Sequence, residues 1–524
     1  MTKTNKKKQD IKNKKEKLAK VKEEREIKEL IKSKKKFIVF FLVFISIFCI
    51  SLVTKALQND TLYTIKIGKL ILNNGIDMMD HFSWHNLSYT YPHWLYDVFI
   101  YLIYCIDGFK SIYISTIIIY IILIASIFIV NIKINKNYTS SAVSAIVCSL
   151  ALGGFATARA QLVSYIIFIW EVYYIESLLE TGKKKYIVLL LLSSLLICNL
   201  HLAVWPFYFI LFLPYIAEYI TYKIFKKLKK DNKLSRYLEN KFTISRTSNI
   251  KYLVLTMIIS TLTGLLTPLG ITPYTYIYKT MIGNSQKYIS EHMALTWAES
   301  PFVIIIAVET ILLGILSKFK VSDVYMLSGL TLMAITSNRH LSFLALIGTL
   351  CLARVFTYFF ERATLNIDNK VIKFTTKYSF MIPAIVLISI LSITIYNKTN
   401  KNRDYLSKEF YPIEAVEYIK NNLDVDNIRL FNDYNFGSYL LFNDIKVFID
   451  SRADLYTKPF SHLEYDIFDD YMYSPGNYHD KFDFYGITHV LIYKVSALND
   501  VLKKDKNYTV LYEDDNFVLY EKNA

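Results

Sequence analysis

Long apolar segments recur along the chain, and they constrain its fold more than any single motif does. The first runs from Phe37 to Ala56 and is interrupted by charge only at Lys55, and its length is what a helix needs to cross the hydrocarbon core of a bilayer. The chain has 524 residues, of which 53% are hydrophobic. The sequence therefore predicts a polytopic α-helical membrane protein with room for one soluble domain.

The net charge of +16 indicates membrane topology rather than nucleic-acid binding, because the basic residues are concentrated in short Lys-rich stretches between apolar segments. Residues 1–36 form a helix-prone Lys/Glu tail without an apolar core, which we interpret as a cytoplasmic extension near anionic lipids. The tail is too long and too charged to begin a signal peptide, so the first span is expected to be retained. The expected partners include membrane lipids and exclude nucleic acid.

No cofactor is predicted. The chain contains no Gly-rich phosphate loop, which disfavours a nucleotide-driven pump. Asp77 and Asp80 are spaced so that they could share a divalent cation, although this spacing is common in loops. The cysteines all lie in apolar stretches, where they offer neither a disulfide framework nor a zinc spacing: Cys49, Cys105, Cys148, Cys198 and Cys351.

The segment from Trp94 to Ile106 decides the topology. As a span, it would place Lys133 to Lys136 and Lys183 to Lys185 outside, against the positive-inside bias. As an amphipathic helix in the outer interface, it leaves every basic loop in the cytoplasm. We predict the second arrangement, with the N-terminus inside, the C-terminus outside and an outer loop over residues 57–111. About eleven helices then cross the membrane: 37–56, 112–131, 141–157, 162–178, 186–198, 203–222, 252–268, 301–317, 323–336, 341–360 and 378–397.

This topology gathers polar side chains at the outer ends of the predicted spans. They are Asp60 and Asp80 in the first outer loop, Arg159 and Gln161, Asn199 and His201, residues 288–297 with Glu291, and Arg339 with His340. Ionisable groups at membrane depth are costly unless they face water or one another, so the set predicts a cavity that opens outward. Each residue taken alone could equally be an interfacial side chain that reaches to water.

The order of a first span, Asp60, an amphipathic outer loop and the element Tyr91-Pro92-His93-Trp94-Leu95 resembles the GT-C superfamily of integral-membrane glycosyltransferases. Protein O-mannosyltransferases and lipid A aminoarabinose transferases are members. Residues 158–162, Ala-Arg-Ala-Gln-Leu, lie in the second outer loop, where such enzymes often place polar residues facing the donor. The resemblance covers about residues 37–400 and rests on topology more than on strict motifs. Thr61 replaces a second acid and the usual double proline is absent, which weakens any inference about the acceptor.

The likeness extends to bacterial members with an Asp-x-Phe-Ser loop, here Asp80 to Ser83, and a C-terminal outer domain. It implies a polyprenyl-phosphate sugar donor and a catalytic aspartate in the first outer loop, a position that Asp60 matches. The expected reaction is an inverting transfer of the sugar to a glycan, lipid or protein acceptor.

Such chemistry needs a base for the acceptor and cations for the leaving phosphate. Asp60, or failing it Asp80, can supply the base, and the guanidinium groups of Arg159 and Arg339 match phosphate oxygens. Further candidates for donor binding are Gln161, His201 and His340, and candidates for substrate contact are His81, Trp84, His85, Trp94 and Glu291. A histidine at a helix end is more often structural, however, and interfacial tryptophans are more often membrane anchors.

Residues 400–524 have shorter apolar runs and more acidic than basic residues, which predicts a small α/β domain with its own core. Strands are expected at 428–431, 446–449, 489–493 and 517–520, and helices at 412–421 and 497–504. Asp450 and Arg452 follow a predicted strand, where ligand sites are common. They could contact the acceptor or form a structural ion pair.

Two other classes of function stay open. A flippase or polymerase of lipid-linked glycans would also have many spans and outer Arg and His residues, but it would not need a carboxylate directly after the first span. A non-catalytic scaffold of the cell envelope would explain an outer domain, but not the set of polar residues at the outer helix ends.

Overall fold

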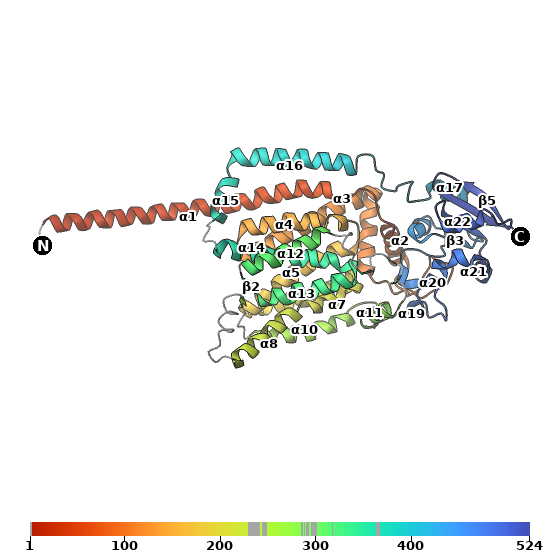
Figure 1. Ribbon diagram of the computed structural model, residues 1–524, viewed down its shortest axis with the longest axis horizontal. Coiled ribbons are helices and arrows are strands. Elements are labelled where there is room, and N and C mark those ends of the chain that lie inside the picture. The colour runs from red at the N-terminus through yellow and green to blue at the C-terminus, as the bar shows by residue number, and fades with distance from the viewer. Residues whose placement is uncertain are drawn as a thin grey trace.

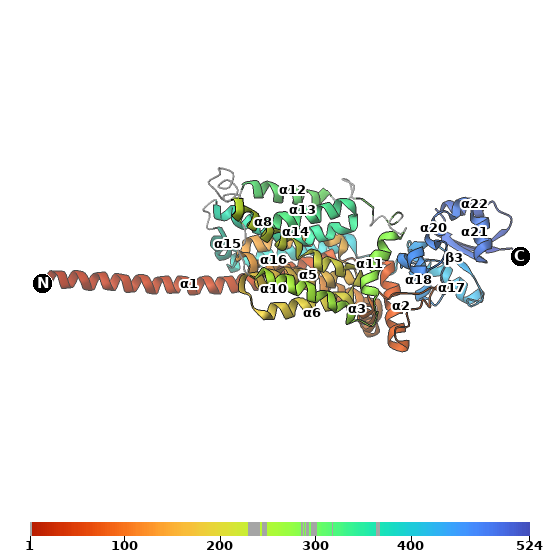
Figure 2. The same cartoon turned by 90° about the horizontal axis from the view of Figure 1, so that it is seen from below.

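The computed structural model describes residues 3–228, 242–243, 249–283, 287, 289, 293–294, 301–316, 318–362 and 367–523. A bundle of roughly parallel helices forms the middle of the molecule (Figure 1). The basic half of helix α1 projects from one end of the bundle, and residues 400–523, which we call the head, cover the other (Figures 1 and 2). We refer to the two ends of the bundle as the tail end and the head end.

The helices of the bundle follow the order of the predicted spans. They are α1 (Lys3–Leu52), α3 (Trp94–Asn135), α4 (Tyr138–Ala151), α5 (Ala160–Thr181), α6 (Lys184–Leu200), α7 (Trp205–Ile210), α8 (Leu213–Leu228), α10 (Ile250–Thr261), α12 (Pro301–Leu316), α13 (Val321–Thr336), α14 (Leu341–Arg362), α15 (Ile367–Thr375) and α16 (Tyr378–Thr399). Short 3-10 turns lie between them: η1 (Gly153–Phe155), η2 (Leu202–Val204), η3 (Leu262–Leu265) and η6 (Asn338–His340). Strands β1 (Phe242–Thr243) and β2 (Phe319–Lys320) pair in parallel.

The apolar surface of the bundle suits a lipid environment. Six of the described helices are long and apolar enough to cross a membrane, and three shorter apolar helices accompany them. Helix α16 is apolar on all sides but little of it is buried, with Ile382 62% and Leu387 69% exposed. In water such a surface would be strongly unfavourable, whereas hydrocarbon solvates it. The protein is therefore a multi-pass membrane protein, and the number of eleven crossings stays a prediction.

Two helices at the head end hold the first loop. Helix α2 (Asn59–Asn74) packs on the first part of α3, so closely that a Cβ atom on Gly68 would lie 2.1 Å from the carbonyl oxygen of Asp97. Helix α3 loses helical backbone geometry at Asp107 and at Gly108, where φ is +58°. This break separates residues 94–106 from the apolar remainder of the helix, at the boundary that the amphipathic pattern of the sequence predicts.

The head contains a four-stranded mixed sheet with the order β3-β4-β6-β5. Strands β3 (Leu430–Asn432) and β4 (His489–Tyr493) are parallel, whereas β6 (Phe517–Lys522) runs antiparallel to both β4 and β5 (Tyr508–Glu513). The accompanying helices are α17 (Ile413–Asn422), α18 (Gly437–Phe442), α19 (Lys458–Ser461), α20 (Ile467–Met472), α21 (Tyr478–Tyr485) and α22 (Ala497–Leu502), with turns η7 (Tyr434–Phe436), η8 (Ala453–Tyr456) and η9 (Ser474–Gly476).

The strand predicted at residues 446–449 does not form. The side chain of Asn432 takes the place of a neighbouring strand, because its Nδ2 donates to the carbonyl of Ile449 at 2.7 Å and its Oδ1 accepts from the amide of Phe448 at 2.9 Å. Val447 instead makes one isolated bridge to Ser83 of the first loop. The prediction also missed β5, in which only one of the six residues is buried and no clear apolar pattern appears.

Candidate active site

A cavity of about 1540 Å³ lies between the bundle and the head. Its wall includes the first turn of α2, the start of α5, the turn after α6, helix α11 (Thr272–Ile282), turn η6 and several head residues. Seven residues predicted from the sequence line it: Asp60, Arg159, Gln161, His201, Arg339, His340 and Arg452. Polar side chains from separate loops therefore share one cavity.

An ion pair between Asp60 and Arg159 lies in the cavity wall. Asp60 is in the first turn of α2, where a carboxylate is favoured by the partial positive charge of the helix N-terminus. Arg159 precedes α5 in extended conformation, and its Nη2 contacts Asp60 Oδ2. The side chains of Arg159 and Asp60 are 28% and 22% exposed, so both a proton acceptor and an anion-binding group are accessible from the cavity.

His201 follows α6 and is almost fully buried. Its Nδ1 lies 3.1 Å from the Ser164 hydroxyl. Burial lowers the pKa of His201 well below its ordinary value, and the positive charges of His93, Arg339 and Arg159 lower it further. A neutral imidazole can orient a bound group by hydrogen bonding but adds no positive charge.

Arg339 and His340 come from the short turn η6 between α13 and α14. His340 Nδ1 lies 3.0 Å from the Met333 carbonyl, and its ring centroid lies 5.2 Å from that of Phe207. Phe207 in turn stacks on Phe343, with a centroid distance of 4.4 Å. Polar groups and an apolar surface therefore meet in this part of the cavity wall.

The sequence analysis missed one pair in the cavity wall. His93 precedes α3, and Asp97 lies one turn into it, with 3.4 Å between His93 Nδ1 and Asp97 Oδ1. The Asp97 side chain has no exposed surface, whereas His93 is 17% exposed and lines the cavity. The signal was available as a His-x-x-x-Asp spacing at the start of a helix, which places both side chains on one helical face.

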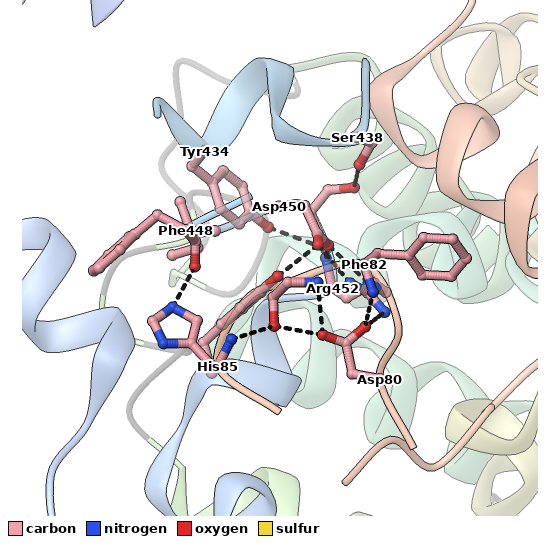
Figure 3. Close-up of polar contacts among 12 residues, drawn as sticks. Asp80, Phe82, His85, Tyr434, Ser438, Phe448, Asp450 and Arg452 are labelled. Atoms are coloured by element: carbon pink, nitrogen blue, oxygen red, sulfur yellow. Dashed lines mark hydrogen bonds and ion pairs between the residues drawn. The ribbon is translucent and has the colours of Figure 1, made fainter. Parts of the chain in front are cut away.

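The carboxylate of Asp80 does not line the cavity and lies in the junction between the first loop and the head. Arg452 donates from Nη1 to Asp80 Oδ1 at 2.7 Å and from Nη2 to Asp450 Oδ2 at 2.7 Å (Figure 3). Tyr456 and Ser83 complete the cluster by donating to Asp450 and Asp80, each at 2.5 Å. Burial alone would raise the pKa of Asp80, but the charge of Arg452 and the hydrogen bonds from Ser83 outweigh it and hold that pKa below its ordinary value.

This cluster gives no support to a catalytic role for Asp80 or a substrate contact by Asp450. Neither lines the cavity, and neither carboxylate has exposed surface. Arg452 borders the cavity, but its guanidinium is committed to both carboxylates and lies over the rings of Phe82 and Tyr89. The arrangement fits the alternative of a structural ion pair.

Four further substrate-contact candidates are described by the structure and do not line the cavity: His81, Trp84, His85 and Trp94. Trp84 Nε1 donates to the Leu430 carbonyl of the head at 3.3 Å. His85 Nε2 donates to the Phe448 carbonyl at 2.9 Å, and burial lowers the pKa of His85 to about 4. His81 pairs with Asp77 at the surface, Trp94 donates to Asn199, and Glu291 lies outside the described residues.

No protein-family model and no curated protein sequence matches this chain. Solved structures do resemble it. The apo oligosaccharyltransferase of Archaeoglobus fulgidus has a TM-score of 0.59 and 10% identity over 91% of this chain and 73% of its own. The oligosaccharyltransferase AglB of the same organism, in complex with an inhibitory peptide and a dolichol-phosphate, has a TM-score of 0.55 and 9% identity over 94% and 74%.

A second protein gives the same fold. ArnT from Cupriavidus metallidurans has a TM-score of 0.53 in the apo state, with 11% identity over 92% of this chain and 97% of its own. Bound to undecaprenyl phosphate, it has a TM-score of 0.50 and 10% identity over the same shares. AglB and ArnT are both GT-C membrane glycosyltransferases, so the predicted resemblance is confirmed at the level of the fold. Over most of its length, this chain has the GT-C fold.

Proposed function

We propose that this protein is a membrane glycosyltransferase that moves a sugar from a polyprenyl-phosphate donor to an acceptor at the outer face of the membrane. The observation that carries the proposal is the cavity that holds Asp60, Arg159 and Arg339 together at one end of a GT-C bundle. The structural neighbours that hold dolichol-phosphate and undecaprenyl phosphate support a lipid phosphate as the donor's carrier.

The donor would be held by its phosphate and its lipid chain. Guanidinium groups bind phosphate oxygens through two parallel hydrogen bonds, and the cavity offers Arg159 and Arg339 for this. Apolar side chains, including Phe207, Ile277 and Phe343, line the same cavity. They suit the first isoprene units of the carrier.

In the transfer, a lone pair on the acceptor's oxygen or nitrogen attacks the anomeric carbon of the sugar. The bond from that carbon to the phosphate oxygen breaks, and its electron pair stays on the phosphate. Asp60 takes the proton that the acceptor loses, as a general base. A single displacement of this kind inverts the anomeric centre.

The proposed orientation follows from where the basic residues lie. Three basic segments lie away from the head (Figure 1): Lys183 to Lys185 at the start of α6, the last turn of α8 with Lys226 and Lys227, and the basic half of α1. Positive residues favour the cytoplasmic side. We therefore place residues 1–36 in the cytoplasm, a GT-C-like domain with about eleven crossings over residues 37–399, and an extracytoplasmic α/β domain over residues 400–524.

The test is turnover of radiolabelled polyprenyl-phosphate sugars by the purified full-length protein in lipid nanodiscs, with free polyprenyl phosphate and labelled product measured. Asp60→Asn keeps the shape of the side chain but cannot accept the proton, so the transfer rate should fall by about two to four orders of magnitude. Binding of undecaprenyl phosphate should change little.

Asp444→Asn is the matched control, because Asp444 pairs with Lys66 at the surface and is 82% exposed. A wild-type protein that consumes none of the donors, but moves labelled lipid between leaflets, would support the flippase alternative. If neither activity is found, a scaffold role becomes the better explanation.

A further inference from the structure

Helix α11 lies at the head end of the bundle, where it follows turn η3 and contacts the head (Figure 1). In Figure 2 it runs across the direction of the bundle helices. Its 11 residues are too few to cross the hydrocarbon core of a bilayer. A helix with this direction and length lies along the membrane surface rather than through the membrane.

One face of α11, together with the residue before the helix, is apolar and exposed. We call this set of five side chains, whose exposed fractions range from 42% to 71%, the α11 stripe: Ile271, Tyr274, Tyr278, Met281 and Ile282. The five positions follow one another at the spacings that place residues on one face of a helix. The stripe therefore forms a continuous apolar surface that the protein itself leaves uncovered.

The opposite face of α11 is fixed to the head. The Tyr276 hydroxyl donates to Asp454 Oδ2 at 2.9 Å, and the Tyr276 ring centroid lies 5.2 Å from that of Phe460. Lys279 Nζ lies 3.4 Å from His462 Nε2 and 5.7 Å from the ring centroid of Phe460. These contacts determine how α11 is rotated about its axis, so the stripe faces away from the head.

The stripe continues the apolar surface of the bundle. The Tyr274 hydroxyl donates to the Thr261 carbonyl at 2.7 Å, and its ring packs against that of Trp205, so the start of α11 is held on the bundle. The preceding elements α10 and η3 also expose apolar side chains: Leu255, Ile258, Leu262, Leu265 and Leu266. Lipid that covers this side of the bundle would therefore reach the stripe without crossing a polar surface.

We propose that α11 is an interfacial helix whose stripe is immersed in the membrane leaflet at the head end of the bundle. This inference goes beyond the proposed function and does not depend on it. The partner of the stripe is the lipid surface, and because none of the five residues is charged, the contact rests on apolar area rather than on anionic headgroups. Since the other face of α11 holds the head, the helix fixes the head at the membrane surface. Met281 also lines the cavity, so lipid borders the cavity at this residue.

Spin labelling of the full-length protein in lipid nanodiscs tests the proposal, in a background without the native cysteines. Nitroxides are attached to Tyr278→Cys and Ile282→Cys in the stripe and, as a matched control, to Phe484→Cys in α21. Phe484 is also apolar and is 63% exposed, but α21 lies in the part of the head that is remote from the bundle (Figures 1 and 2).

At positions 278 and 282, relaxation by oxygen, which dissolves in hydrocarbon, should exceed relaxation by a water-soluble nickel chelate. The immersion depth should be about 5–10 Å, as for other interfacial helices. At position 484 the nickel chelate should dominate.

Two results would overturn the proposal. Relaxation dominated by nickel at both stripe positions would place the stripe in water. Weak relaxation by both agents would show that protein, either a second copy of this chain or another partner, covers the stripe. The measurement requires no turnover, so its outcome is independent of whether the protein transfers a sugar.

Discussion

At the scale of single residues, Arg159 has two competing partners. In the absence of substrate it pairs with Asp60, and in the proposed reaction it also binds the donor phosphate. The ion pair positions the guanidinium in advance, which reduces the entropy lost on binding. A bound phosphate would share the Arg159 guanidinium with the Asp60 carboxylate.

We expect Arg159→Ala and Arg339→Ala each to weaken donor use by about 1.5–3 kcal/mol, the range for hydrogen bonds to charged groups. Lysine at either position should restore only part of the loss, since it cannot bind two phosphate oxygens in a plane. The measurement is KM for the lipid-linked donor. Arg362 donates to the Leu316 carbonyl and does not line the cavity, so Arg362→Ala should have the KM of the wild type. A near-normal KM in both Arg159→Ala and Arg339→Ala would show that these residues do not bind the donor.

The lowered pKa of His85 predicts how the stability of the junction between loop and head depends on pH. Its pKa is lowered to about 4 in the folded protein, against 6.5 for an unperturbed histidine. Between these values the unfolded chain binds a proton that the folded chain does not, so stability should fall as pH decreases from about 6.5 to 4. Thermal unfolding of the full-length protein across this range should show the decline, and His85→Phe should flatten it.

Asp80 affects stability in a different pH range. Its folded pKa is lowered, so its contribution is present above the unfolded value of about 3.8 and is lost only at lower pH. A decline confined to pH below 4 would therefore assign the effect to the carboxylates rather than to His85.

At the scale of elements, the first loop is part of the head as much as of the bundle. The amide of Val447 donates to the Phe82 carbonyl, Trp84 and His85 bind head carbonyls, and Arg452 joins Asp80 to Asp450. The head also contacts the start of α2, where Asn59 Nδ2 donates to the Tyr434 carbonyl at 3.1 Å.

Arg452→Met should be the most damaging change in this junction, because it leaves two buried carboxylates without their cation. Removal of one partner from a buried ion pair typically costs about 3–5 kcal/mol. Asp80→Asn should cost less, since Arg452 keeps Asp450. The readout is the midpoint of thermal unfolding. Lys408→Met, which removes an exposed ion pair with Glu414, should change the midpoint very little, because water screens exposed ion pairs. A similar shift in both variants would contradict the role of the buried cluster.

At the scale of the whole molecule, orientation can be tested directly. Cysteine introduced at Lys184 should be labelled only after permeabilisation of cells, and cysteine at exposed Val495 of the head should be labelled from outside. The background is a variant without the native cysteines. Labelling of position 184 in intact cells would invert the topology and turn Trp94 to Ile106 back into a membrane span.

Properties that depend on length and charge were predictable from the sequence. The apolar runs marked the bundle helices, and the positive-inside bias gathered Asp60, Arg159 and Arg339 at one end. What could not be seen was the partner of Asp80, because Arg452 lies 372 residues later in the chain and no local pattern links them. The side-chain contacts of Asn432 likewise removed a strand that its apolar sequence favoured.

The junction between Asp80 and Arg452 has a consequence for biosynthesis. At about 5–20 residues per second, the ribosome needs roughly 20–75 s to make the 372 residues that separate them. During that time the early loop has emerged while its late partner does not yet exist. The last quarter of the chain thus completes the cavity wall. A nascent or truncated protein would insert into the membrane without a complete cavity. Release of the finished chain would set the moment at which the protein can bind its substrates.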